Sequence, residues 1–181
     1  MGKPGSPATV LRLVEDHYAS LYRFAYRLSG SSADAEDLTQ ETFCKAQASL
    51  SQLRDPAKVR GWLFSILRRD YLKRLREDQR EGCVPLDVAG DVAESLPEPL
   101  PAIDPDQLQQ ALNELHVDYR TPLILFYFEE FGYREIAEQM DLPIGTVMSR
   151  LSRAKAHLRA RLVPAEAVSA DGALRRANDG L

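Results

Sequence analysis

The most constraining part of the sequence is residues 133–162, YREIAEQMDLPIGTVMSRLSRAKAHLRARL. Its first third has apolar residues at the spacing of a short helix, namely Ile136, Ala137 and Met140. Asp141-Leu142 ends that helix, and Pro143 suits the first turn of the next because it lacks an N–H that would otherwise stay unpaired. A longer helix follows, whose predicted buried side carries Ile144, Val147, Leu151 and Leu158. This pattern predicts a helix-turn-helix.

The other side of the second helix is cationic. Between residues 142 and 165 there is no acid, and the five cations are Arg150, Arg153, Lys155, Arg159 and Arg161. Such a helix fits a DNA major groove, where its first turns reach base edges and its arginines reach phosphates. Asp141 stands in the turn where Gly is common, and Asp tolerates a left-handed backbone better than most residues. A solvated basic helix in an ordinary bundle has a similar pattern, so this segment alone leaves both interpretations open.

Two supporting helices are predicted ahead of the helix-turn-helix. The first follows Asp104-Pro105 and is marked by Leu108, Ala111, Leu112 and Leu115. Pro122 is predicted to open the second, which is apolar nearly all round over residues 123–128 and therefore belongs at the centre of a domain. The C-terminal domain is thus predicted as four helices over residues 105–163, followed by a tail at 164–181.

The N-terminal half predicts three more helices, so the fold class is all-α. The first covers residues 9–28 and is broken at Gly30. The second is capped by Ser31 and extends to about residue 50, burying Leu38, Phe43 and Ala46. The third runs from about residue 57 to 80, and its predicted buried residues are Leu63, Ile66, Leu67, Tyr71 and Leu75. We expect these helices to form a bundle within residues 9–82.

The second and third helices carry opposite charges on their outer faces. On the second, Asp34, Asp37 and Glu41 share one face beside Gln40, a pattern that suits a divalent metal, a basic protein surface or simple solvation. We predict no metal site, because neither a His nor a second acidic helix is evident nearby. The third helix has Trp62 at its head among cations, as in proteins that bind single-stranded nucleic acid, and the alternative is that Trp62 and Tyr71 are core residues and the cations a solvated face.

An acidic segment separates the cationic third helix from the cationic helix of the helix-turn-helix. Residues 83–118 contain eight acids and no Lys or Arg, and residues 83–104 include Pro85, Pro97, Pro99 and Pro101 without a helical or strand period. We predict a flexible linker at 83–104. The net charge of −4 argues against indiscriminate binding of nucleic acid, so the alternation of charge is more informative than its total.

Several other classes of protein are disfavoured by the sequence. No apolar run reaches the length of a membrane span and no signal-peptide core is present, so we expect a cytoplasmic protein without stable membrane insertion of its own. Cys44 and Cys83 form no CxxC pair and are interpreted as reduced thiols, with a redox pair left open. No cofactor loop and no catalytic grouping of Ser, His, Asp or Cys is evident, which predicts a protein that is not an enzyme.

Taken in order, these segments resemble the small extracytoplasmic-function (ECF) sigma factors of bacteria. The matching stretches are DAEDLTQETFCKA (34–46), RGWLFSILRRDYLKRLR (60–76) and the helix-turn-helix at 133–162, which with their spacing cover most of residues 9–163. The resemblance implies that residues 9–82 form the promoter-melting domain, sigma region 2. It likewise implies that residues 105–163 form region 4, which reads the upstream promoter element.

The resemblance also implies partners and site residues. Docking on the largest subunit of core RNA polymerase is assigned to Asp37, Gln40 and Glu41. Contacts to the melted DNA strand are assigned to Trp62, Arg68, Arg69, Lys73 and Arg74. Recognition of upstream promoter DNA is assigned to Thr146, Ser149, Arg150, Arg153 and Lys155. An anti-sigma factor is a further implied partner, and the acidic linker is implied to occupy polymerase channels that later hold RNA.

Two other functions remain as alternatives. An ordinary helix-turn-helix repressor or activator would bind a palindromic operator tightly without polymerase. A metal-dependent nucleic-acid enzyme using Asp34, Asp37 and Glu41 would cleave DNA in the presence of magnesium or manganese.

Overall fold

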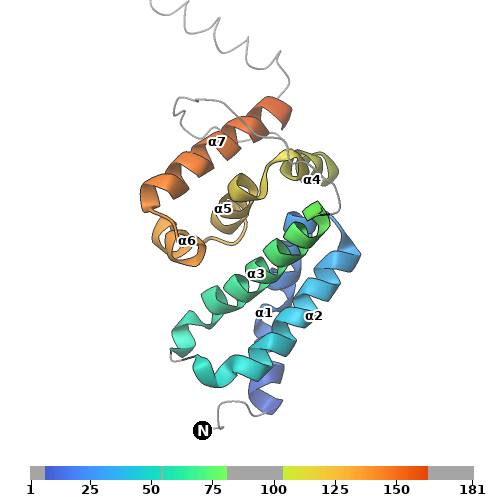
Figure 1. Ribbon diagram of the computed structural model, residues 1–181, viewed down its shortest axis with the longest axis vertical. Coiled ribbons are helices and arrows are strands. Elements are labelled where there is room, and N and C mark those ends of the chain that lie inside the picture. The colour runs from blue at the N-terminus through green and yellow to red at the C-terminus, as the bar shows by residue number, and fades with distance from the viewer. Residues whose placement is uncertain (1–6, 54, 81–103, 163–181) are drawn as a thin grey trace, which may run out of the picture.

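The computed structural model describes residues 7–53, 55–80 and 104–162 (Figure 1). Within these ranges the chain forms α-helices and two short 3₁₀ turns, with no strand, so the all-α prediction is confirmed. The helices are α1 (Pro7–Ser29), α2 (Ser32–Ser49), α3 (Val59–Arg80), α4 (Pro105–Glu114), α5 (Val117–Tyr127), α6 (Tyr133–Met140) and α7 (Ile144–Leu162). The 3₁₀ turns, Leu50–Gln52 and Pro56–Lys58, lie between α2 and α3. Almost all of the predicted linker and the whole predicted tail lie outside the described residues.

Helices α1, α2 and α3 form the N-terminal bundle (Figure 1). Its fully buried side chains come from all three helices and include Leu21, Phe24, Leu38, Leu63 and Leu67. The predicted burial of Leu38, Phe43 and Ala46 on α2 is confirmed. Leu11 and Tyr18 also follow the apolar spacing of α1, yet they are exposed, because the interior of the bundle begins further along this helix.

The turn between α1 and α2 needs a glycine for two reasons. Gly30 adopts a φ of +75°, a left-handed conformation that favours glycine. A Cβ at this position would also lie 2.7 Å from the Asn113 side chain on α4. Ser31 then caps α2 as predicted, since its hydroxyl accepts a hydrogen bond from the Asp34 N–H at 3.3 Å.

Helices α4 to α7 form the C-terminal domain, with the apolar helix α5 at its centre. Leu123, Ile124 and Leu125 of α5 are buried, and α7, which contacts this helix, buries Val147, Leu151 and Ala154. The predicted helix-turn-helix is confirmed as α6 and α7. Asp141 ends α6 with φ 53° and ψ 52°, the left-handed geometry expected at this turn.

Two local predictions in this domain are wrong. Pro122 does not open a helix but lies inside α5, which begins at Val117 and is capped by His116, whose Nδ1 accepts from the Asp118 N–H at 3.3 Å. Ile144 was predicted to be buried and is 41% exposed. Because Ile144 is the first residue of α7, the stripe that packs against α5 begins only at Val147.

The two helical groups pack directly against each other in the closed arrangement seen in Figure 1. Helix α1 contacts α4 and α5, and α3 contacts α6. The rings of Phe64 on α3 and Phe131, in the loop after α5, meet edge to face with centroids 5.1 Å apart. We call this contact region between the N-terminal bundle and the C-terminal domain the seam. Across it, the buried apolar side chains of both groups form one continuous cluster.

The left-handed turn of the helix-turn-helix can be tested by two substitutions of one residue. Asp141→Ala should lower the free energy of unfolding by about 1 kcal/mol, because a Cβ without a local polar partner is disfavoured at positive φ. Asp141→Gly should leave it within about 0.5 kcal/mol of the unsubstituted protein, because glycine accepts this conformation. Urea denaturation measures both. Equal destabilisation by the two substitutions would mean that the Asp141 carboxylate, rather than the backbone, sets the stability of the turn.

Candidate nucleic-acid interface

The cations of α3 are divided between two faces of the helix. Arg69 and Lys73 are exposed: the Arg69 Nε donates to the Ser65 carbonyl of its own helix at 3.2 Å, and the Lys73 Nζ lies 3.9 Å from Glu77. Arg68 points instead into the seam, where its Nη1 donates to the Gln139 carbonyl of α6 at 3.1 Å. Burial lowers the pKa of the Arg68 guanidinium. The predicted strand-binding residues therefore do not form a single open surface in the closed arrangement.

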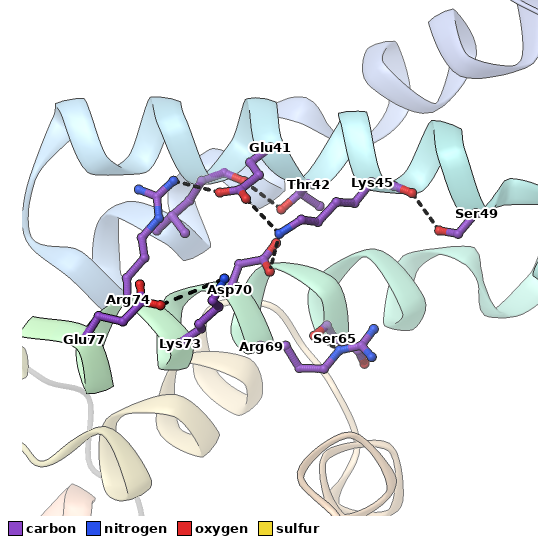
Figure 2. A network of polar contacts seen from close by, with 11 residues as sticks. Glu41, Thr42, Lys45, Ser49, Ser65, Arg69, Asp70, Lys73, Arg74 and Glu77 are labelled. Carbon is purple, nitrogen blue, oxygen red and sulfur yellow. Dashed lines mark hydrogen bonds and ion pairs between the residues drawn. The ribbon is translucent and has the colours of Figure 1, made fainter.

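Arg74 lies in a polar network between α2 and α3, drawn in Figure 2. Its Nη2 is 2.9 Å from one carboxylate oxygen of Glu41, and the Lys45 Nζ is 2.7 Å from the other. The same Lys45 Nζ reaches Asp70 Oδ1 on α3, also at 2.7 Å. The hydrogen bond from Lys45 lowers the pKa of Glu41 most, and the hydrogen bond from Arg74 lowers it further. The network thus joins a predicted polymerase-binding residue to a predicted DNA-binding residue.

The acidic face of α2 is not uniform. Asp34, Asp37 and Gln40 are exposed, whereas Glu41 is partly covered and paired with two cations. Among the described residues, no group of three or more His, Cys, Asp or Glu side chains is arranged to hold a metal ion. Sequence reasoning missed Lys45, although its position four residues after Glu41 is a recognised spacing for a helical ion pair.

Tyr71 of α3 belongs to the core, which confirms its predicted burial. It is 9% exposed, and its hydroxyl donates to the Leu28 carbonyl at 2.7 Å while accepting from Arg120 Nη2 at 2.9 Å. Burial raises the pKa of the Tyr71 phenol. Trp62 is partly buried and packs against the core cluster, so part of its surface stays open to solvent.

Several arginines lie in the seam. Arg60 of α3 donates to the Glu129 carbonyl and lies over the Phe131 ring, 4.4 Å from its centroid. Arg27 of α1 lies over the Phe128 ring at 4.1 Å, and Arg120 bonds to Tyr71 from the other domain. Aromatic faces and a backbone carbonyl are effective partners for these partly desolvated guanidinium groups. Sequence periodicity could not find these contacts, because each joins residues distant along the chain.

Glu129 is the buried acid of the seam. It is 2% exposed, and its Oε2 lies 3.9 Å from Arg60 Nη2. Its other carboxylate oxygen, Oε1, has no hydrogen-bond partner among the described residues. Burial raises the pKa of Glu129, and the nearby positive charges of Arg23, Arg60 and Arg27 oppose this shift.

Helix α7 presents the predicted upstream-element residues to different extents. Ser149 and Arg153 are exposed, whereas Thr146 and Lys155 are partly buried. Arg150 turns back to α5, with its Nη1 3.5 Å from an Asp118 carboxylate oxygen and 3.4 Å from the Asp118 carbonyl. Met148, which sequence reasoning missed, is 49% exposed beside Ser149. An exposed Met at the start of such a helix offers an apolar contact for a thymine methyl group.

Comparisons with known protein families match both helical groups. The family model for Sigma-70 region 2 matches residues 13–81, and that for Sigma-70, region 4 matches residues 106–158. The ECF RNA polymerase sigma factor EcfG of Rhodopseudomonas palustris is 35% identical over 150 residues, which cover 79% of each chain. The ECF RNA polymerase sigma factor SigL of Mycobacterium tuberculosis is 32% identical over 165 residues, covering 89% of this chain and 93% of SigL.

The chain belongs to the ECF RNA polymerase sigma factors. Sigma factors direct RNA polymerase to promoters, and this one is accordingly a transcription initiation factor. Another relative, SigE of Mycolicibacterium smegmatis, is 36% identical over 162 residues, which cover 81% of this chain and 59% of SigE. The described residues of this sigma factor include no helix long and apolar enough to cross a membrane.

Solved structures of sigma factors share its fold. The sigma factor RpoE, in complex with the anti-sigma factor NepR from Bartonella quintana, is 31% identical, and the match has a TM-score of 0.69 over 82% of this chain and 93% of that one. CnrH, in complex with the cytosolic domain of CnrY, matches with a TM-score of 0.64 at 23% identity, over 86% and 88% of the two chains, and supports the fold alone. The first match extends over both helical groups of this sigma factor.

The buried carboxylate of the seam makes the sigma factor's stability depend on pH in a defined direction. Because burial raises the pKa of Glu129, its contribution to stability is fully present below the ordinary carboxyl pKa, about 4.3, and is lost as pH rises through the folded-state pKa. Glu129→Gln should therefore raise the free energy of unfolding at pH 7 by up to about 1 kcal/mol, and this gain should shrink as pH falls. Denaturation curves between pH 4.5 and 8 measure it.

The adjacent, exposed Glu130 provides the control for this prediction. Glu130→Gln removes the same charge from the same loop, and it should show a much smaller pH-dependent gain, because repulsion from Glu130 is the smallest of the causes that act on the pKa of Glu129. If Glu129→Gln instead destabilises the protein most at pH 7, attraction to the surrounding arginines outweighs the cost of burying the carboxylate.

Proposed function

We propose that this sigma factor docks on core RNA polymerase through α2, reads upstream promoter DNA with α7 and holds the melted strand on α3. It catalyses no reaction itself and acts with the polymerase on DNA in the cytoplasm. The observation that carries the proposal is that both sigma regions occur in one chain, each with an exposed polar helix face. Asp37 and Gln40 are exposed on α2, Arg69 and Lys73 on α3, and Ser149 and Arg153 on α7.

Within this proposal the domains keep their predicted bounds, 9–82 for region 2 and 105–163 for region 4, joined by the acidic linker at 83–104. Direct readout of bases by α7 would rest mainly on Ser149, Arg153 and Met148, because Arg150 is engaged with Asp118. Each module alone should bind DNA weakly, since a single small domain buries limited surface. Polymerase would hold both domains in register on the promoter, so that the binding free energies of their two DNA contacts add.

The closed arrangement fits a factor that is inactive when free. Arg68 cannot hold a DNA phosphate while its guanidinium is bound to the Gln139 carbonyl across the seam. The domains must therefore separate before α3 presents all of its predicted strand contacts. RpoE, which this chain resembles over both domains, was solved with an anti-sigma factor. An anti-sigma factor for this chain would accordingly keep the two domains together.

Run-off transcription with purified core polymerase from the same organism, on promoters of its own genome, tests the proposed function. The protein should make transcription start at a specific subset of promoters, and Arg153→Ala should reduce those transcripts about tenfold, because a lost base or phosphate contact costs about 1–3 kcal/mol. Arg161→Ala is the matched control: this arginine is exposed at the far end of α7 and pairs with Glu114, so its loss should have little effect.

Other outcomes of that experiment would support the alternative functions. Tight binding to a palindromic duplex without polymerase, with no effect on run-off transcripts, would indicate a helix-turn-helix repressor or activator. DNA cleavage that requires magnesium or manganese would indicate a nuclease. Either result would contradict a sigma-factor role for this chain.

Separation of the domains can be followed by fluorescence energy transfer. Dyes placed at Ala19→Cys of α1 and at Ala160→Cys of α7, both exposed, with Cys44→Ser and Cys83→Ser to keep labelling specific, report the distance between the two helical groups without covering the docking face of α2. Transfer should be efficient in the free protein and should fall when core polymerase and promoter DNA are added. The same transfer efficiency in free protein and holoenzyme would contradict a requirement for opening.

A further inference from the structure

The Glu41 carboxylate is shared between two cations that come from different helices. Arg74 of α3 contacts one oxygen at 2.9 Å, and Lys45 of α2 contacts the other at 2.7 Å (Figure 2). Lys45 has a second partner in Asp70, at 2.7 Å. Asp70 is the best-buried member of the network, with its side chain 13% exposed. Lys45 and Asp70 can therefore hold α2 and α3 together even when the contact between Glu41 and Arg74 is broken.

The pair of Glu41 and Arg74 joins two different tasks of the proposed function. Glu41 is assigned to the polymerase and Arg74 to the melted strand, yet in the free protein each neutralises the other. We propose that polymerase docking and strand capture are coupled by exchange of this pair: a basic polymerase group takes Glu41, and the freed Arg74 takes a backbone phosphate of the single strand. This inference rests on the proposed function and adds an order of events to it.

The strength of the pair is suitable for exchange. The side chains of Arg74 and Glu41 are 36% and 39% exposed, and ion pairs with this much solvent contact are weak enough for a competing partner to displace. A fully buried pair would be too costly to break, because it would leave an unpaired charge in the interior. Coupling between two binding sites is reciprocal, so the captured strand must strengthen polymerase docking by the same factor. For an exposed pair that factor is about two- to fivefold.

A purely structural ion pair is the competing explanation, and a mutant cycle separates the two. The assay is binding of the full-length free protein to a single-stranded oligonucleotide with the nontemplate sequence of one of its promoters, measured by fluorescence anisotropy at several salt concentrations. Glu41→Gln should tighten binding two- to fivefold, because Arg74 becomes available for a phosphate. One added phosphate contact should also steepen the log–log salt dependence by about 0.7. Arg74→Gln alone should change binding little, because Glu41 already occupies Arg74 in the free protein, and Glu41→Gln should then have no further effect.

Two control variants exclude a general effect of charge. Glu36→Gln removes one negative charge from an exposed position of the same helix, and it should change binding much less than Glu41→Gln does. Glu41→Asp keeps the charge but shortens the side chain, so it should release Arg74 and tighten binding without altering net charge. Thermal denaturation of each variant checks that the contact between Lys45 and Asp70 still holds the bundle together.

The possible outcomes distinguish failure of this inference from failure of the proposed function. If Glu36→Gln tightens binding as much as Glu41→Gln, or if Glu41→Gln still tightens binding when Arg74 is already Gln, the exchange is wrong, and strand contact by Arg74 is then judged from transcription alone. If Arg74→Gln supports run-off transcription with core polymerase as well as the unsubstituted protein does, Arg74 does not contact the strand, and that part of the proposed function fails with the exchange.

Discussion

The closed arrangement depends on the seam, where arginines of both domains are desolvated together with aromatic rings. Phe64 and Phe131 join the two apolar cores directly, and Arg60 lies over Phe131 while bonding to a backbone carbonyl. On the other side of the contact, Arg120 is buried and bonds to the hydroxyl of Tyr71. Separation of the domains removes these contacts, although Arg120 keeps Asn113 and Arg60 keeps Phe64 as partners within their own domains. Opening returns them to water, which solvates a cation well, so the seam is stable without being permanent.

This kind of contact suits a protein that must exist in two arrangements. A wholly apolar seam would leave a large hydrophobic surface exposed after opening and would favour aggregation. Because arginine and tyrosine side chains share the seam with its apolar residues, part of the surface that opening exposes is compatible with water. Glu129 also makes opening easier, because burial of its carboxylate costs free energy in the closed arrangement and opening recovers that cost. The closed form can therefore be stable enough to cover Arg68 and still yield to polymerase and DNA.

Local patterns in the sequence predicted most of the fold but little of the seam. Helical periodicity located the helices, and Asp141 was correctly placed at a left-handed turn, because both features depend on neighbouring residues. Periodicity failed for Ile144, which has the right spacing but lies at the helix end beyond the domain's interior. Of the predicted site residues, Arg68 and Arg150 turn toward protein partners, with Arg68 contacting the other domain. Those partners are distant along the chain, so no local pattern could reveal them. The DNA and polymerase contacts of all the candidate residues stay predictions.

The contact of Arg150 depends on Pro122, which was wrongly predicted to open a helix and lies inside α5. Because Pro122 has no N–H, the Asp118 carbonyl four residues earlier lacks its normal helical partner. The Arg150 guanidinium of α7 approaches that carbonyl at 3.4 Å and the Asp118 carboxylate at 3.5 Å. The Asp118 carbonyl, which lacks a helical donor in α5, thus helps to hold α7, the helix proposed to read DNA, in place. Anchoring fixes the rotation of α7 about its own axis, which decides whether Ser149 and Arg153 face outward. An arginine in the middle of a recognition helix can therefore contribute to specificity without touching a base.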